Sequence, residues 1–112
     1  MSTQNDESLA CRLSEAQKEA RRPDVEALFR DGMDRYHETE QGYLFEFRDD
    51  DEVLARLFQF VKAEHACCPF FQFDVTVHPH DGPVEMEIGG SDRVKSFITD
   101  EMIPEVEAAR ES

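Results

Sequence analysis

The sequence predicts an α+β protein with the element order α-β-β-α-β-β-α, a four-stranded, largely antiparallel sheet and helices packed on one face. Two pairs of short segments alternate apolar and polar residues, which is typical of strands with one buried face. Turn residues separate the two members of each pair. Segments with helical periodicity lie before the first pair, between the two pairs and after the second pair, and these are the expected helices.

The chain is long enough for one domain with one hydrophobic core. It has 112 residues, of which 39% are hydrophobic, including nine Phe. We divide it into a flexible N-terminal lead over residues 1–10, a single α+β domain over 11–103 and an acidic C-terminal helical tail over 104–112. Pro104 marks the start of the tail, because proline either kinks or restarts a helix.

The first helix begins at a capping box. Ser14 and Gln17 have the spacing at which each side chain bonds the other residue's backbone N–H. Pro23 then either kinks this helix or begins a second helical segment as its first residue. The apolar face continues beyond it to about Asp31.

Two hairpins supply the four strands. The first joins residues 33–40 and 43–48 through a Gln-Gly turn, and its first strand is polar on both faces, which predicts a sheet edge. The second joins residues 71–77 and 84–88 through a turn rich in Pro and Gly. The alternation predicts these inward-facing residues: Tyr43, Phe45, Phe47, Phe71, Phe73, Val75, Val77, Val84, Met86 and Ile88.

The central helix begins in the acidic run 49–52, which suits the positive end of the helix dipole, and extends to about Cys67. Pro69 ends it, because the residue before a proline avoids helical angles. A last helix follows a cap at Ser91. A spacing of 3.6 residues predicts the apolar faces: Leu54, Leu57, Phe58, Val61 and His65 on the central helix, and Val94, Phe97 and Ile98 on the last.

The charge balance excludes several kinds of partner. The net charge is −14, from 26 acidic and 12 basic residues. Such a surface repels the phosphates of nucleic acids and the headgroups of anionic membranes, so we expect neither as a partner. The sequence has no membrane-spanning stretch and no signal peptide, which predicts a cytoplasmic protein. Three Cys in that context indicate a reducing compartment, and their odd number argues against a disulfide framework.

The segment 64–69 (Glu-His-Ala-Cys-Cys-Pro) is the most chemically distinctive part of the chain. Glu64 lies three and four positions before Cys67 and Cys68, which places it beside both on a helix. A carboxylate at the edge of the core needs a partner: a base, a hydrogen-bond donor or a metal. Two thiolates and a carboxylate are ligands for zinc or another thiophilic metal, and adjacent thiols also chelate trivalent arsenic or divalent mercury.

A packing role for these cysteines stays open beside the metal site. The repeated Cys-x-x-Cys pattern of common zinc sites is absent, and adjacent helical side chains point about 100° apart. Cys68 could then be a small buried hydrophobe with Cys67 as its neighbour. A catalytic Cys–His pair is disfavoured, because the helix C-terminus raises a thiol pKa and His65 points elsewhere. No residue is therefore assigned a catalytic role.

Cys11 is the third thiol, and it lies just before the first helix. It could complete a three-thiol site if that helix packs beside the helix that carries Glu64. His78 and His80 have the alternate spacing of a metal pair, but His80 lies in a turn, so we expect both to face solvent.

The segment 64–71 resembles the Glu-x-x-Cys-Cys-Pro-Phe core of a small family of prokaryotic proteins. The likeness extends over roughly residues 11–98, through Cys11-x-Leu13, the strand after Gly42 and the Gly89-Gly90 turn. The family has no established activity, and its members are loosely associated with metal resistance. The resemblance implies a set of four residues, Cys11, Glu64, Cys67 and Cys68. Pro23 departs from the pattern, since the first helix of the family runs unbroken.

These observations favour a non-enzymatic, thiol-rich protein that binds zinc or a softer metal or metalloid ion, in metal handling or resistance. Cys67 and Cys68 are the expected main ligands, Glu64 a ligand or a base beside them, and Cys11 a third thiol.

The alternative function is a protein-interaction or dimerisation module, acting as a homodimer or with another protein. In that case Phe70, Phe71 and Phe73 form an exposed apolar patch, and the cysteines are structural. A redox protein that uses Cys67 or Cys68 is a third interpretation.

The acidic excess and the presence of only three Lys predict adaptation to high salt. Screening then removes the repulsion among carboxylates, so the melting temperature should rise steadily from low salt to molar KCl. A thermal melting series measures this, and a melting temperature that does not rise with salt would contradict the prediction.

Overall fold

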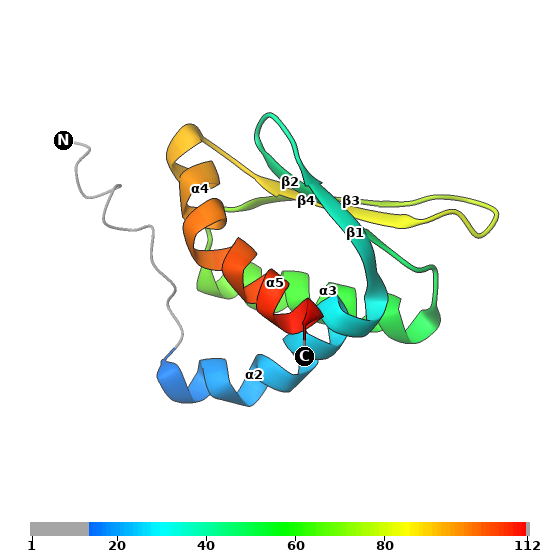
Figure 1. Ribbon diagram of the computed structural model, residues 1–112, viewed down its shortest axis with the longest axis horizontal. Coiled ribbons are helices and arrows are strands. Elements are labelled where there is room, and N and C mark those ends of the chain that lie inside the picture. The colour runs from blue at the N-terminus through cyan, green and yellow to red at the C-terminus, as the bar shows by residue number, and fades with distance from the viewer. Residues whose placement is uncertain (1–13, 112) are drawn as a thin grey trace.

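The computed structural model describes residues 14–111, and it confirms the α+β class and the predicted order of elements. The helices lie together on one side of the sheet (Figure 1). The expected lead over residues 1–10 and Cys11 lie outside the described residues. The elements are α2 (Glu15–Ala27), the π-helical turn η1 (Leu28–Gly32), β1 (Met33–Glu38), β2 (Gly42–Phe47), α3 (Asp51–Cys67), β3 (Gln72–Val77), β4 (Val84–Gly89), α4 (Asp92–Phe97), the π-helical turn η2 (Ile98–Met102) and α5 (Ile103–Arg110).

The sheet joins the two hairpins through their second strands. Its order is β1-β2-β4-β3, and all neighbouring strands are antiparallel. Phe45 of β2 lies opposite Met86 of β4, and Met86 lies opposite Val75 of β3. The polar strand β1 is an edge, as its sequence predicts, and β3 is the other edge.

The core lies between the inner strands and the helices. The inward side chains of β2 and β4 are almost fully buried, as their alternation predicts. Phe29 of η1 packs on this layer, with its ring centroid 5.7 Å from that of Phe45 and 5.2 Å from that of Phe60 on α3. Both contacts have the edge-to-face geometry that aromatic rings prefer. The turn η1 therefore links the sheet to α3.

The central helix packs through only part of the face that its periodicity predicts, with Leu54 and Val61 partly buried against the core. Leu57 is buried as expected, but Phe58 is 50% exposed and His65 is also exposed. Apolar residues occupy more than one side of this helix, so spacing alone does not choose the side that packs. The buried residues of α3 are Val53, Leu57, Phe60 and Cys67.

Both helix caps named from the sequence are present. Ser14 and Gln17 form the reciprocal capping box of α2, and the Ser91 side chain accepts from the Val94 N–H at the start of α4. Pro23 lies inside α2, which continues to Ala27. None of the helices described in residues 14–111 combines the length and the apolar character needed to span a bilayer.

The C-terminal segment contributes more to packing than an acidic tail would. The helix α5 carries Val106 and Ala109 into the core, 2% and 4% exposed, and it contacts both α2 and η1. Glu107 accepts a hydrogen bond from the Tyr36 hydroxyl, which attaches this helix to the edge strand β1. The helix α5 also forms one side of the pocket described below.

Which side of α3 packs against the core can be tested with Phe58 and Phe60, which lie two positions apart. Phe60 is 5% exposed, so Phe60→Ala should lower the free energy of unfolding by about 3–5 kcal/mol. Phe58→Ala should cost about 1 kcal/mol or less, because half of that side chain already faces water. Urea unfolding of both variants measures the difference, and equal losses would contradict the observed face.

Candidate functional site

The end of α3 brings the two adjacent cysteines together. Cys67 is the last helical residue, and Cys68 leaves the helix with φ −125° and ψ 77° while its N–H bonds the Glu64 carbonyl at 2.6 Å. Pro69 enforces this departure. Because Cys68 no longer follows the helix, its side chain turns back toward Cys67, and the two Sγ atoms lie 3.6 Å apart. Both residues are buried, at 1% and 3% exposure.

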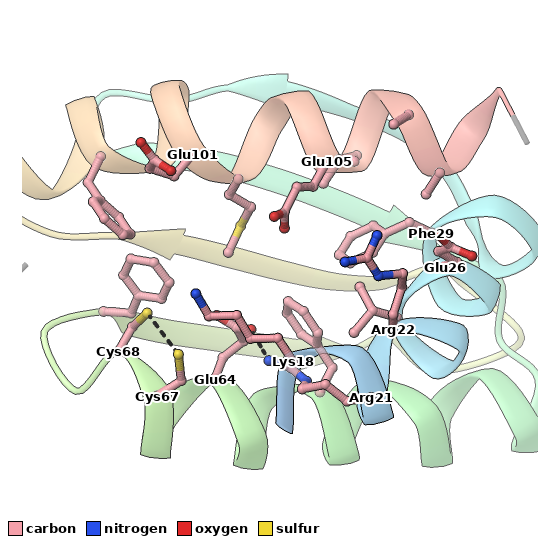
Figure 2. Close-up of a pocket in the computed structure, with 18 of the residues that line it drawn as sticks. Lys18, Arg21, Arg22, Glu26, Phe29, Glu64, Cys67, Cys68, Glu101 and Glu105 are labelled. Atoms are coloured by element: carbon pink, nitrogen blue, oxygen red, sulfur yellow. Dashed lines mark hydrogen bonds and ion pairs between the residues drawn. The ribbon is translucent and has the colours of Figure 1, made fainter. Parts of the chain in front are cut away.

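The two cysteines differ in chemical state. Cys68 is a free thiol whose S–H points at Cys67 Sγ, as the dashed line in Figure 2 shows. Cys67 is disulfide-bonded, a state that the expected reducing compartment does not favour. Cys11, the candidate third thiol, lies outside the described residues.

Glu64 has the partner that its position requires. Arg21 of α2 donates from Nη1 to Glu64 Oε2 at 2.6 Å, and the two side chains are only 20% and 12% exposed. The Arg21 guanidinium also lies over the Phe60 ring, 5.7 Å from its centroid. The pair shows that α2 packs beside the helix that carries Glu64, which was the condition under which Cys11 could complete a three-thiol site.

Sequence reasoning missed Arg21. The pair joins residues 43 positions apart, and α2 carries two other basic residues, Lys18 and Arg22, that could equally have been the partner. The sequence indicated that Glu64 needs a partner, but it did not indicate which basic residue of the first helix that partner is. The second nitrogen of Arg21, Nη2, is buried and has no hydrogen-bond partner among the residues that the structure describes.

These groups line a pocket of about 580 Å³ bounded by α2, α3 and the α4–η2–α5 segment. Figure 2 shows Cys67, Cys68 and Glu64 on the α3 side, with Glu105 pointing in from α5. Lys18 lies between them on α2. Aromatic rings complete the lining, including Phe60, Phe71 and Phe97.

Burial dominates the electrostatics of the thiol. Burial, reinforced by the negative charge of Glu64, raises the pKa of Cys68 to about 12, while Arg21 and Lys18 act in the opposite direction. The pKa of Glu105 is raised as well, by burial and then by Glu64. At neutral pH Cys68 is therefore a protonated thiol.

The histidines lie away from this pocket. His65 is exposed on the outer side of α3, and His80 is exposed in the turn before β4. His78 is partly buried and bonds Glu85 at 2.7 Å, so it faces solvent less than expected. Within residues 14–111, no three His, Cys, Asp or Glu side chains form a group that could hold a metal ion.

Comparison with known proteins does not identify a relative from which a function could be inferred. No protein-family model, no curated protein and no solved structure matches this chain. The resemblance to the Glu-x-x-Cys-Cys-Pro-Phe proteins therefore stays an expectation from the motif, and the function is argued from the contacts of Glu64, Cys67 and Cys68.

Removal of the Glu64 charge and removal of the Arg21 charge should shift the pKa of Cys68 in opposite directions. Glu64→Gln removes a charge that raises this pKa, so Cys68 should alkylate faster than in the wild type between pH 8 and 9. Arg21→Gln removes a charge that lowers the pKa, so alkylation should slow. Each unit of pKa changes the thiolate fraction about tenfold in this range.

Peptide mapping by mass spectrometry assigns the alkylation rate to Cys68. Glu85→Gln is the control, because this carboxylate on β4 is not among the groups that shift the Cys68 pKa. A change of the same sign in the Glu64 and Arg21 variants would show that they act by opening the pocket and not by charge.

Proposed function

We propose that this protein binds one thiophilic metal or metalloid ion, such as zinc or trivalent arsenic, through the sulfurs of Cys67 and Cys68. Glu64 acts as a ligand or as a base beside them, and Cys11 is the proposed third thiol. The observation that carries the proposal is the 3.6 Å separation of two buried sulfurs that face one pocket.

That separation suits chelation of a single ion. Zinc binds thiolate sulfur at about 2.3 Å in tetrahedral geometry, which places two sulfurs on one ion about 3.8 Å apart. In the disulfide-bonded form, Cys67 and Cys68 come within about 0.2 Å of that value. Side chains that are held this way before binding lose less freedom when the ion arrives.

The surrounding charges support binding of a cation as thiolates form. Burial disfavours an isolated thiolate at Cys68, and a bound cation removes this penalty because the ion itself carries the compensating charge. Arg21 and Lys18 already act in the same direction on Cys68. Arg21 also holds Glu64, which fixes the carboxylate beside the two sulfurs.

Ion binding requires the reduced form of the site, because Cys67 is disulfide-bonded in the structure. A dithiol reductant of the cell would supply two electrons and two protons, giving two protein thiols while its own thiols form a disulfide. Capture of a divalent ion by Cys67 and Cys68 then releases two protons. Such reductants are abundant in the cytoplasm, which is the location we propose.

The aromatic surface that the dimerisation alternative requires is mostly buried. Phe71 is buried at 6% exposure, and Phe70 and Phe73 are partly buried. Phe71 packs against both of them and against Phe97 of α4. The expected exposed patch of three aromatic residues is therefore wrong, and Phe71 instead lines the thiol pocket.

Zinc titration of the reduced protein tests the proposed function. The wild type should bind about one zinc per chain and protect Cys67 and Cys68 from alkylation. Cys67→Ser and Cys68→Ser should each weaken zinc binding by more than the ~10–100-fold that loss of an outer-shell partner costs. His78→Ala is the matched control, because this potential ligand lies outside the pocket lining and should leave the affinity unchanged.

Native mass spectrometry gives the stoichiometry, and competition with a chromophoric chelator gives the affinity. Binding that survives both serine substitutions, or reduced thiols that stay reactive in excess zinc, would contradict the proposal.

A further inference from the structure

The pocket is much larger than a bare ion requires. An ion bound to Cys67 and Cys68 sits within about 2.3 Å of each sulfur, whereas the pocket encloses about 580 Å³. That volume falls in the range of roughly 300–1,000 Å³ typical of sites for organic molecules. Most of the space therefore remains to be filled after an ion is bound.

The walls near the sulfurs suit an apolar group. Phe71 follows the cysteines directly, with its N–H bonded to the Cys68 carbonyl at 3.1 Å, and its ring centroid lies 6.0 Å from that of Phe97. Phe60, on the same helix as the cysteines, adds a third ring, and Met102 adds a polarizable thioether. Side chains of this kind bind aryl groups through apolar and edge-to-face contacts.

A second observation indicates that the pocket holds more than an ion. Arg21 Nη2 is a buried donor without a partner in the described part of the chain, although Nη1 of the same group is bound to Glu64. Buried donors in native proteins are almost always satisfied by protein, water or ligand. The π-face of an aryl group in this pocket is a weak acceptor that could receive this N–H.

We propose that the ligand is a monosubstituted trivalent arsenical, in which arsenic binds the two sulfurs and an aryl or similar apolar group fills the pocket. This inference rests on the proposed function and narrows it. An arsenic(III) centre with one As–C bond has two exchangeable positions, and Cys67 and Cys68 supply two sulfurs at chelating distance.

The binding step balances without a change of oxidation state. An arsenical R–As(OH)₂ reacts with the reduced thiols of Cys67 and Cys68. Two S–H and two As–O bonds break, two As–S bonds form, and two water molecules leave. The As–C bond stays intact, so this is binding and not catalysis. Reduction of the Cys67 disulfide by a dithiol precedes it, as for the bare ion.

Competition with dithiothreitol tests the inference. Phenylarsenous acid, methylarsenous acid and arsenite are each partitioned between the reduced protein and dithiothreitol, so that intrinsic As–S strengths cancel. The protein should favour the phenyl over the methyl compound by about 10-fold or more beyond the preference of dithiothreitol, because it buries the ring. Native mass spectrometry reads out the partition.

Leucine variants locate the phenyl group. Phe60→Leu and Phe97→Leu should each reduce the phenyl preference several-fold while leaving the affinity for arsenite unchanged. Phe58→Leu is the matched control, because Phe58 is 50% exposed on the same helix as Phe60 and is not part of the lining.

The outcomes separate this inference from the proposed function. If arsenite binds to the protein but the phenyl compound has no added preference, the organic group is excluded and ion binding stands. A phenyl preference that the Phe60 and Phe97 variants leave intact also overturns the inference, because the ring then lies elsewhere. If none of the three arsenicals competes with dithiothreitol and zinc is not bound, both proposals fail.

Discussion

The partly buried ion pair between Arg21 and Glu64 is the contact on which the pocket depends. No residue of α2 is buried in the described structure; Val25 packs against the core from one side, and the helix continues directly into the buried Leu28 and Phe29 of η1. Along α2 itself, Arg21 bonds Glu64 of α3 at 2.6 Å, and its guanidinium packs over Phe60. Removal of one partner would leave a poorly solvated charge, which makes such pairs costly to break. The pair thus fixes one wall of the pocket and orients the carboxylate beside the thiols.

The same region combines features that suit a soft ligand better than acid–base or nucleophilic chemistry. Burial and Glu64 keep Cys68 protonated at neutral pH, and the cysteines lie at the end of a helix, where the dipole disfavours a thiolate. A soft cation reverses this preference because it binds thiolates with partly covalent bonds. Both cysteines are buried, so little water reaches the sulfurs, which strengthens that selection. The disulfide at Cys67 adds a dependence on redox state, since only the reduced site presents both sulfurs.

Local features were predictable from the sequence, whereas the contacts between distant elements were not. The capping box at Ser14, the cap at Ser91 and the end of α3 before Pro69 depend on neighbouring residues, and the structure contains all three. The face of α3 was only partly right, because Phe58 and Phe60 offer competing apolar sides and packing against η1 buries Phe60. The pairing of Arg21 with Glu64 and the burial of α5 depend on tertiary packing, for which the sequence holds no local signal.

The central claim is that Cys67 and Cys68 hold one ion between them, and X-ray absorption at the zinc edge tests it most directly. We would load the reduced protein with one equivalent of zinc and compare its spectrum with that of the Cys68→Ser variant. The account predicts two or three sulfur neighbours at about 2.3 Å in the wild type and one fewer in the variant. A first shell of oxygen and nitrogen alone, or a sulfur count that the substitution leaves unchanged, would contradict it.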